Sequence, residues 1–448
     1  MFNRKSRLVC SIAGVLAAGA AVGWGADPVQ EDARIRELQA KVAALESRQA
    51  QNSKDLAATA DAVLRDAEKR SQLLANGEMG AGYDNGFYIR SGSDFYFHPW
   101  LQFQFRNVTN WRQEAKHDGQ EDNTQNGFEV RRMKFGFDGH VFSPNLTYQF
   151  LWATDRNSGT PKLEEAWAKY MFADQWGLRL GQIKDPVAHE GLVSSKRLLA
   201  VERTFLQDTL GLGDNFVQAV TLIYQDNKGP IRVEGGFSDG VGSANTDFTN
   251  TITNADGTTK RSGNFGVAGR VEYKAFGNWK SYDDFTALGN KEDLLVFGLA
   301  GDWTQNGDTN AILHTADVQW ENASGLALYG AFLGRAVQNG LTPGGAVEDF
   351  YDWGAMAQAA YLIDQKWEVF ARYDYTTLDD AALASDVQGK VHEITAGVNY
   401  YMHGQAAKFT LDVTWLPNGA PKDDTGADIL KNNDKDELML RAQFQLLI

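Results

Sequence analysis

Basic residues occupy the polar face of many segments of this 448-residue chain that have the two-residue period of a β-strand. Because successive side chains of a strand point to opposite faces, this spacing gathers the basic groups on one side of a sheet. Arginine presents a planar fork of donors that fits phosphate oxygens. The basic residues on the predicted polar faces are Arg106, Arg132, Lys134, Arg179, Arg232, Arg270, Arg372 and Arg441.

A second basic group lies in the long segment 185–215, which follows Lys184 directly. This segment contains Lys196, Arg197 and Arg203. A loop of this length that bends between the strands would place these cations in the path of a solute. Several spaced cations can compensate the lost hydration of an anion and still release it. The cluster Lys196, Arg197 and Arg203 is therefore the strongest candidate for anion contact.

The same faces carry acidic residues, and these support a different interpretation. Mixed charges on a sheet face often form ladders of ion pairs, which keep the surface wet without selecting a ligand. For any single arginine the ladder is the favoured interpretation, and a weakly selective surface remains an alternative to an anion site. The acidic residues are Asp138, Glu234, Glu272, Glu368 and Asp374 on the strands, with Asp185, Glu190, Glu202 and Asp208 in the segment 185–215.

Catalysis and metal binding find little support in the sequence. The histidines are scattered and lack the spacing of a metal site, and no phosphate-cradling glycine loop occurs. Glu164 and Glu165 are adjacent, so on a regular strand they would face opposite ways and could not form an acid/base pair. We expect no catalytic residue, no metal and no cofactor.

Alternating apolar and polar residues predict about sixteen strands. The final segment shows the pattern well, with Leu438, Leu440 and Phe444 on one face and Arg441 and Gln443 on the other. The predicted strands span 95–111, 127–141, 146–154, 163–172, 176–184, 216–225, 230–237, 264–274, 294–304, 311–321, 326–335, 351–362, 366–375, 390–402, 407–416 and 436–448.

Short and long connections mostly alternate between these strands. This asymmetry, with period-two strands, is typical of a closed antiparallel barrel that crosses an outer membrane, where closure satisfies every backbone hydrogen bond. The long stretch 275–293 is the exception, since a short turn is due there, and fourteen or eighteen strands remain alternatives. The sequence thus predicts an all-β transmembrane barrel over residues 95–448, preceded by a helical segment.

Residues 1–26 resemble a secretory signal, with Arg4, Lys5 and Arg7 before an apolar stretch rich in Ala and Gly. The single cysteine, Cys10, lies inside it, so a processed chain would contain no disulfide and no catalytic thiol. The formal net charge is −15, and removal of these three cations without any acidic residue would make it −18. Such acidity disfavours nucleic-acid partners and cautions against assuming anion selectivity.

Residues 27–75 are predicted to form a periplasmic helix, joined by a flexible glycine-rich link over 76–94 to the barrel. An apolar heptad seam favours a short coiled coil between subunits, and a single solvated helix is the alternative. The seam has Ile35, Val42, Gln49, Leu56, Val63 and Arg70 at its a positions, and Leu38, Leu45, Asn52, Thr59, Asp66 and Leu73 at its d positions.

From about Gly82 to Ile448 the chain resembles the phosphate-selective porin O and P family. The resemblance rests on the order and spacing of four stretches: GYDNGFYIR at 82–90, FEVRRMKFGFDG at 128–139, LRLGQIKDP at 178–186 and GVNYYM at 397–402. It implies a trimeric sixteen-strand barrel in the outer membrane that passes small anions, in some members phosphate or polyphosphate.

We therefore expect a passive outer-membrane channel for small anions, embedded in outer-membrane lipid as a homotrimer. Two alternatives remain: a general pore that is weakly selective or prefers cations, and a barrel that tethers the envelope through its helix. A soluble sugar-binding β-protein is a more distant alternative.

Overall fold

The computed structural model describes residues 28–75, 79–84, 86–113, 123–253, 259–261, 263–384, 387–424, 426–431 and 435–448. The chain divides into two compact units, residues 1–78 and residues 79–448. The predicted signal at 1–26 lies outside the described residues.

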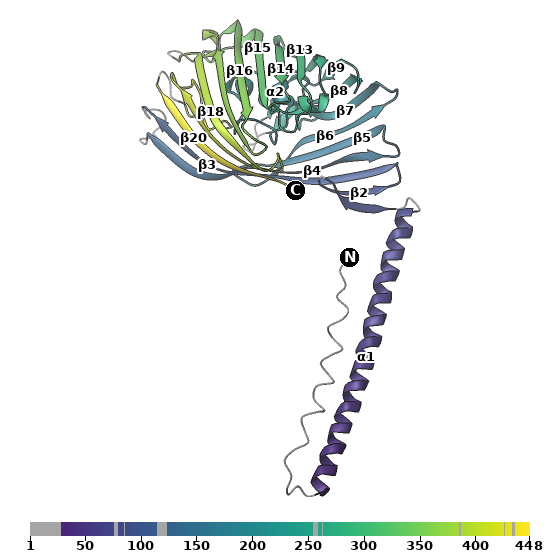
Figure 1. Cartoon of the computed structure of the whole chain (residues 1–448). Helices are drawn as coiled ribbons and strands as arrows, with labels where there is room; N and C mark the ends of the chain where they lie inside the picture. Colours follow the sequence, from purple (N-terminus) through teal and green to yellow (C-terminus); the bar gives the residue numbers. More distant parts are fainter. Residues whose placement is uncertain are drawn as a thin grey trace. The chain divides into compact units, whose positions relative to one another are not determined.

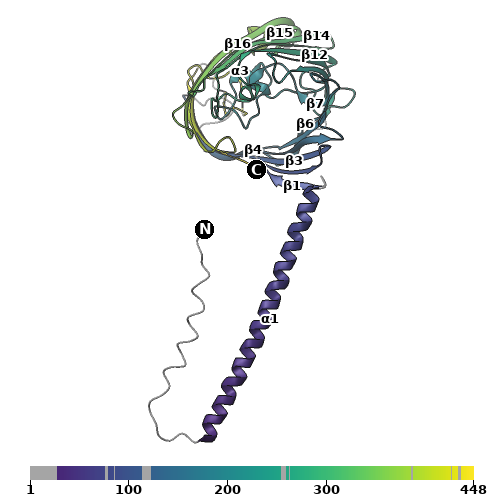
Figure 2. The ribbon, with the colours of Figure 1, turned by 45° about the vertical axis from the view of Figure 1, so that its right-hand side comes forward.

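In the second unit, the described residues form sixteen antiparallel strands that close into a barrel (Figures 1 and 2). Each strand pairs with its neighbours along the chain, and the last strand, β20, pairs with β3 to close the ring. The strands are β3 Phe95–Arg112, β4 Thr124–Val141, β5 Leu146–Thr154, β6 Pro161–Met171, β7 Trp176–Lys184, β8 Phe216–Gln225, β9 Ile231–Ser238, β12 Phe265–Phe276, β13 Leu294–Asn306, β14 Thr309–Glu321, β15 Leu326–Leu341, β16 Val347–Leu362, β17 Trp367–Thr377, β18 Lys390–His403, β19 Ala407–Leu416 and β20 Glu437–Leu447.

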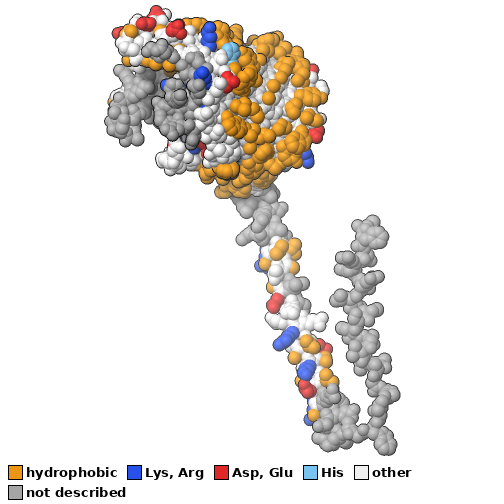
Figure 3. All heavy atoms as spheres, turned by 90° about the vertical axis from the view of Figure 1, so that its left-hand side faces the viewer, with side chains coloured by type: hydrophobic (Ala, Val, Ile, Leu, Met, Phe, Trp, Pro, Cys, Tyr) orange, Lys and Arg blue, Asp and Glu red, His pale blue; other side chains and the backbone are white. Residues whose placement is uncertain are grey.

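The burial pattern is that of a barrel with an apolar exterior and a polar interior. Along β19, for example, Phe409 and Leu411 are exposed on the outer face, whereas Thr410 and Asp412 are buried inside. Hydrophobic side chains cover a broad area of the outer surface in Figure 3. Such a surface is stable in hydrocarbon, since polar groups face the lumen and all ladder bonds are satisfied within the wall.

The predicted alternation of connections is largely confirmed. One end of the barrel, here called the short-turn end, holds the tight turns 142–145, 172–175, 226–230, 322–325, 363–366 and 404–406. The opposite, long-loop end holds the connections 239–264, 378–389 and 417–436, and the small hairpin of β10 Thr251–Thr253 and β11 Thr259–Arg261 lies in the first of these. Three connections at this end are short and depart from the rule: 155–160 between β5 and β6, 307–308 between β13 and β14, and 342–346 between β15 and β16.

The sequence predicts a flexible link over 76–94, but the structure has strands in this range. Strands β1 Gly80–Tyr83 and β2 Phe87–Ser91 form a hairpin in this region, and β2 pairs with the start of β3. Ring stacking of Tyr88 on Tyr96, at 5.8 Å between centroids, adds a cross-strand contact. The alternation of these aromatic residues, more than the glycines between them, decides the local structure.

In the first unit, residues Pro28–Ala75 form the single long helix α1. Its described heptad side chains Leu38, Val42 and Leu45 are all more than half exposed in the isolated chain. Within the described residues, no helix has both the length and the apolar character that a membrane crossing requires.

Candidate functional site: a lumen narrowed from both ends

Residues 185–215, between β7 and β8, fold into the barrel lumen as predicted, and we call them the inserted loop (Figure 2). The loop contains the short helices α2 His189–Leu192 and α3 Phe205–Thr209, and Thr204 caps α3 by accepting a hydrogen bond from the amide of Gln207. Its apolar residues, such as Leu206 and Leu210, are fully buried in a cluster with inward-facing residues of β15 to β18. Apolar burial therefore holds the loop inside the barrel.

Charged residues of the wall hold the backbone of the inserted loop. Arg372 donates to the carbonyl of Glu202 at 2.7 Å, and Lys408 donates to the carbonyl of Leu198 at 2.8 Å. Asp412, Glu393 and Asp374 accept hydrogen bonds from the backbone amides of Val201, Phe205 and Leu206. These wall charges satisfy buried peptide groups, which would otherwise cost free energy.

A second segment enters the lumen from the short-turn end. Residues 277–293, between β12 and β13, form the stretch that the sequence marked as too long for a turn, and we call them the turn-end insert. The insert contains the 3-10 helix η1 Trp279–Asp283, with Trp279 and Tyr282 buried. Trp279 donates its indole hydrogen to the carbonyl of Gly229 at 2.9 Å. The strand count of sixteen is therefore correct, and the long connection is an inward fold.

The two segments meet inside the barrel. The ring of His189 stacks on that of Tyr282 with 3.9 Å between centroids and 5° between planes. Arg197 pairs with Asp283 at 3.2 Å across the same junction. Burial lowers the pKa of His189 to about 4, so this imidazole is neutral near neutral pH. The lumen is thus narrowed by one segment from each end.

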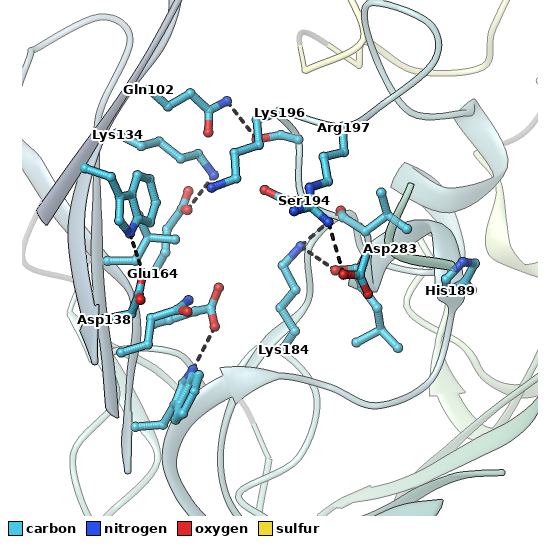
Figure 4. Close-up of a pocket in the computed structure, with 18 of the residues that line it drawn as sticks. Gln102, Lys134, Asp138, Glu164, Lys184, His189, Ser194, Lys196, Arg197 and Asp283 are labelled. Carbon is cyan, nitrogen blue, oxygen red and sulfur yellow. Dashed lines mark hydrogen bonds and ion pairs between the residues drawn. The ribbon is translucent and has the colours of Figure 1, made fainter. Parts of the chain in front are cut away.

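Two cavities lie beside the inserted loop. The turn-side cavity, of about 420 Å³, opens toward Trp100 and Asp138 on β3 and β4 and is shown in Figure 4. The loop-side cavity, of about 360 Å³, lies nearer the long-loop end, beside Arg131 and Arg156. Charged residues of the turn-side cavity are Lys134, Arg179, Lys184, Lys196, Arg197, Arg232, Asp138, Glu164, Glu165, Glu272 and Asp283.

Two β-bulges change which residues face the lumen. On β4, Gln104 lies opposite Arg132 but Phe105 lies opposite Val130, so Arg131 is the extra residue and also points inward. On β6 the register shifts in the same way at Glu164. Glu164 and Glu165 consequently both line the turn-side cavity, and the expectation that they face opposite ways is wrong. Each bulge adds one charged side chain to those that its strand presents to the lumen.

The twelve predicted cations fall into three groups. Six of them border the turn-side cavity: Lys134, Arg179, Lys184, Lys196, Arg197 and Arg232. Arg132 and Arg203 border the loop-side cavity instead. Arg106, Arg270, Arg372 and Arg441 line neither cavity and make buried hydrogen bonds. The predicted cluster Lys196, Arg197 and Arg203 is therefore divided between the two sides of the inserted loop.

Ten of these twelve cations form ion pairs with carboxylates, as the ladder interpretation predicts. The partners are Glu202 for both Arg106 and Arg132, Glu164 for Lys134, Glu234 for Arg179, Asp214 for both Lys184 and Arg203, Asp283 for Arg197, Asp317 for Arg270, Glu393 for Arg372 and Asp412 for Arg441. Among the described residues Lys196 and Arg232 have no such partner, and the ammonium of Lys196 lies 4.3 Å from the centre of the Trp100 ring.

Glu202 of the inserted loop is the most heavily paired carboxylate. It accepts hydrogen bonds from Arg106, Arg131 and Arg132 at 2.5 to 2.6 Å. Burial opposes its ionisation, but the three guanidinium charges outweigh burial and hold the pKa of Glu202 well below its usual range. Three of the basic side chains of β3 and β4 are thus bound to one loop residue.

The aromatic part of the site is not among the residues predicted from the sequence. Trp100 and Trp167 line the turn-side cavity. Trp100 precedes the inward-facing Gln102 by two positions, and Trp167 follows the inward-facing Glu165 by two positions. That spacing is the signal that could have placed both tryptophans in the lumen. Tyr282 and Asp283 gave no such signal, because they lie in the insert.

A closed barrel with an apolar exterior, a polar lumen and an inserted constricting loop is the architecture of a porin, a channel of the outer membrane. The described wall and both cavities fit that class. The sequence profile of the phosphate-selective porin O and P family matches residues 107–446, and the chain belongs to this family.

One protein of known sequence and two solved structures are similar to this chain. An uncharacterised protein of Aquifex aeolicus (strain VF5) is 26% identical over 309 residues, which are 64% of this chain and 71% of that protein. The fold is shared with an anion-selective porin from Comamonas acidovorans, at a TM-score of 0.55 and 13% identity, over 79% of this chain and 99% of that chain. OmpF of Salmonella typhi, solved with daunomycin, has a TM-score of 0.52 and 14% identity, over 82% of this chain and 100% of that chain.

Proposed function

We propose that this chain forms a water-filled outer-membrane channel for passive diffusion, with a weak preference for small anions at the turn-side cavity. The observation that carries the proposal is Lys196. Its ammonium borders the cavity from the inserted loop, and within the described residues it has an aromatic face instead of a carboxylate as its neighbour. An anion passing through the cavity gains attraction from this charge without first breaking an ion pair.

Paired cations contribute less to such selectivity. A guanidinium or ammonium that is bound to a carboxylate presents little net field, and ten of the twelve predicted cations are bound in this way. The proposed channel binds its solute weakly, as transport requires. Phosphate and polyphosphate are the anions that the family implies, and the Comamonas acidovorans porin of the same fold is described as anion-selective.

The extensive pairing also supports a second candidate, a general pore that is weakly selective or prefers cations. The chain has a formal net charge of −15, and Asp138 and Glu165 border the cavity without a lysine or arginine partner in the described residues. In this case the inserted segments would limit the size of the solute and would contribute little to ionic preference.

The proposal includes a cleaved signal at 1–26, a periplasmic helix α1 and a homotrimer in outer-membrane lipid. The exposed apolar residues Leu38, Val42 and Leu45 support helix pairing between copies. An envelope-tethering role of α1 is a separate hypothesis, which deletion of residues 31–75 would test by comparing envelope integrity with solute uptake. The proposal assigns the chain no catalysis, no cofactor and no nucleic-acid partner.

The decisive experiment is single-channel recording of the full chain in a planar bilayer under a KCl gradient, followed by titration with phosphate. We expect an anion-selective reversal potential that moves toward zero in Lys196→Met and stays unchanged in Lys366→Met, an exposed turn lysine. A cation-selective current without block by phosphate would favour the general pore. Absence of channels would contradict both.

A further inference from the structure

Four charged residues of the turn-side cavity take no part in an ion pair between a carboxylate and a lysine or arginine, and we call them free. Asp138 and Glu165 are carboxylates that have no lysine or arginine partner in the described part of the chain, although Nδ1 of His98 lies 3.3 Å from Asp138. Lys196 and Arg232 are cations that have no carboxylate partner there. The other cavity charges are bound to one another or to neighbouring groups of opposite sign. A solute that enters the cavity therefore meets two free anions and two free cations.

The free carboxylates are held in fixed positions by tryptophan. Trp100 donates its indole hydrogen to Asp138 at 3.1 Å, and Trp167 donates to Glu165 at 2.9 Å. The bulge at Glu164 lets Glu165 face the cavity together with its neighbour. Asp138 has His98 as a second neighbour, and each carboxylate keeps further acceptor capacity for a ligand. Asp138, on β4, lies at the left of Figure 4, and Glu165 belongs to β6.

The free cations lie against aromatic faces. Lys196 lies 4.3 Å from the centre of the Trp100 ring, and Arg232 lies at the same distance from the centre of the Trp279 ring. The Nε of Arg232 is buried and has no hydrogen-bond partner among the described residues. A cation–π contact attracts a cation but does not neutralise it, so both groups keep charge for a ligand.

This arrangement is a poor binding site for three simpler ligands. A small inorganic anion gains attraction from Lys196 as it passes, but it also meets the negative fields of Asp138 and Glu165, both of which act on that lysine, so it is not retained. A simple cation meets Lys196 and Arg232 in the same space. A sugar would need a bare indole face, but Lys196 covers Trp100, and Arg179 lies 5.6 Å from the centre of the Trp167 ring. A solute with both signs of charge finds a free partner for each of its charges.

We infer that the turn-side cavity is a weak binding site for small zwitterionic solutes, which carry one carboxylate and one ammonium group as amino acids do. The inference rests on the proposed passive channel and names its solute class. The carboxylate of the solute contacts Lys196 or Arg232, and its ammonium contacts Asp138 or Glu165. Because each contact lies in a wet lumen, binding is weak and release is fast.

Four solutes of nearly equal size isolate the effect of charge. Serine carries both charges, glycerate lacks the ammonium, serinol lacks the carboxylate, and glycerol lacks both. The full chain is placed in proteoliposomes with equal salt on both sides, and the flux of each radiolabelled solute is measured below saturation. We expect serine to pass about fivefold faster than glycerol, the ratio expected of one weak charge contact, and faster than either singly charged analogue.

Substitutions then assign the two contacts. Lys196→Met should lower the flux of serine and glycerate and raise that of serinol. Asp138→Asn should lower the flux of serine and serinol and raise that of glycerate, and Glu165→Gln provides a second carboxylate variant in case Asp138→Asn folds poorly. Lys366→Met and Asp174→Asn change exposed turn residues and are the matched controls, with no expected effect.

The outcomes separate this inference from the proposed function. If glycerate passes faster than serine and the carboxylate variants leave the ratio unchanged, the channel is an anion channel and the zwitterion site is wrong. If serine, glycerate, serinol and glycerol all pass at the same rate, the cavity has no charge preference, which also overturns the inference. If no solute passes, the channel itself is contradicted.

Discussion

The ammonium of Lys134 lies 2.5 Å from a carboxylate oxygen of Glu164, and this ion pair borders both lumen cavities. Lys134 comes from β4, and Glu164 is the bulged residue of β6. Both side chains are mostly buried, at 7% and 16% exposure. The pair therefore lies where a solute passes from one cavity to the other, and its net charge of zero should make that passage weakly selective.

Breaking this pair should shift ion selectivity in a direction set by the remaining partner. In Lys134→Met the unpaired Glu164 should move the KCl reversal potential toward cations, with a change of about twofold to fivefold in the permeability ratio. Glu164→Gln should move it toward anions. The double variant should return close to the wild-type potential, because both charges are gone. Equal potentials in all four proteins would show that the pair lies outside the path of the ions.

Lys196 should lose its charge at a lower pH than an ordinary lysine. Burial and the neighbouring charge of Arg197 lower the pKa of Lys196. As pH rises through this lowered pKa the ammonium becomes neutral, so anion preference should decline on the alkaline side before a free lysine titrates. Reversal potentials between about pH 7 and 10.5 measure the decline. Lys196→Arg should keep its preference over the whole range, and a wild-type profile as flat as that of the arginine variant would contradict the prediction.

The barrel wall could be predicted because each strand is specified by a pattern within a short stretch of sequence. Period-two alternation requires only that one face meets hydrocarbon and the other meets water, and short turns follow from the same sequence stretch. Strands β5, β7, β8 and β19 accordingly have the predicted bounds. Strand ends at the long-loop end were predicted too short, for example at β15, which extends to Leu341. Extension there depends on pairing with β16, which alternation alone does not show.

The site could be predicted only in part, because its pairs join residues far apart in the chain. Alternation places Arg132 and Lys134 inside, but the bulge that adds Arg131 depends on how β3 and β4 align. Arg203 belongs to the predicted cluster, yet it binds Asp214 and backbone carbonyls of its own loop. Nothing in the spacing of residues 277–293 showed that they turn inward, where Tyr282 meets His189.

Arg203 should matter for stability more than for selectivity. Its side chain is 3% exposed and pairs with Asp214 at 2.8 Å. In Arg203→Met, Asp214 keeps Lys184 at 2.7 Å as a second partner, but the protein loses a buried ion pair and a hydrogen bond to the carbonyl of Glu190, which costs about 1–3 kcal/mol. We expect Arg203→Met to lower the free energy of unfolding in urea by this amount, while Lys280→Met, an exposed lysine of the turn-end insert, leaves it unchanged. A stable Arg203→Met protein that has lost anion preference would instead restore the role predicted from the sequence.

The heptad seam of α1 should stabilise an oligomer if the helix pairs between copies. Leu38 and Leu45 occupy d positions, whereas Ala40 and Ser47 occupy f positions on the opposite side. Leu38→Asp with Leu45→Asp should lower the temperature at which the detergent-solubilised oligomer dissociates. Ala40→Asp with Ser47→Asp adds the same charge outside the seam and should change it little. Equal dissociation temperatures for both variants would indicate a single solvated helix.

The stability of the junction between the inserted loop and the turn-end insert should depend on pH through His189 and Asp284, which have opposite effects. Burial lowers the pKa of His189 to about 4, and burial raises the pKa of Asp284 to about 7. Their ordinary values are about 6.5 and about 3.9. Between roughly pH 4 and 6.5, His189 is protonated in the unfolded chain and neutral in the folded chain, so its effect on stability increases as pH rises. In the same range Asp284 is protonated in the folded chain and ionised in the unfolded chain, so its effect on stability decreases as pH rises. The two effects therefore oppose each other.

Single substitutions should uncover each slope. In Asp284→Asn the effect of His189 remains, so the junction should lose up to about 3 kcal/mol as pH falls from about 6.5 to about 4. In His189→Gln the effect of Asp284 remains, so stability should fall as pH rises from about 4 to about 7. Wild type should lie between them with a weak dependence. Hydrogen exchange of residues 277–293 as a function of pH measures this directly, because release of Tyr282 from His189 exposes the backbone of the insert. Parallel pH profiles in the two variants would show that neither group controls the junction. Opposite slopes would identify the stacked pair His189 and Tyr282, together with Asp284, as the point where pH acts on the narrowed lumen.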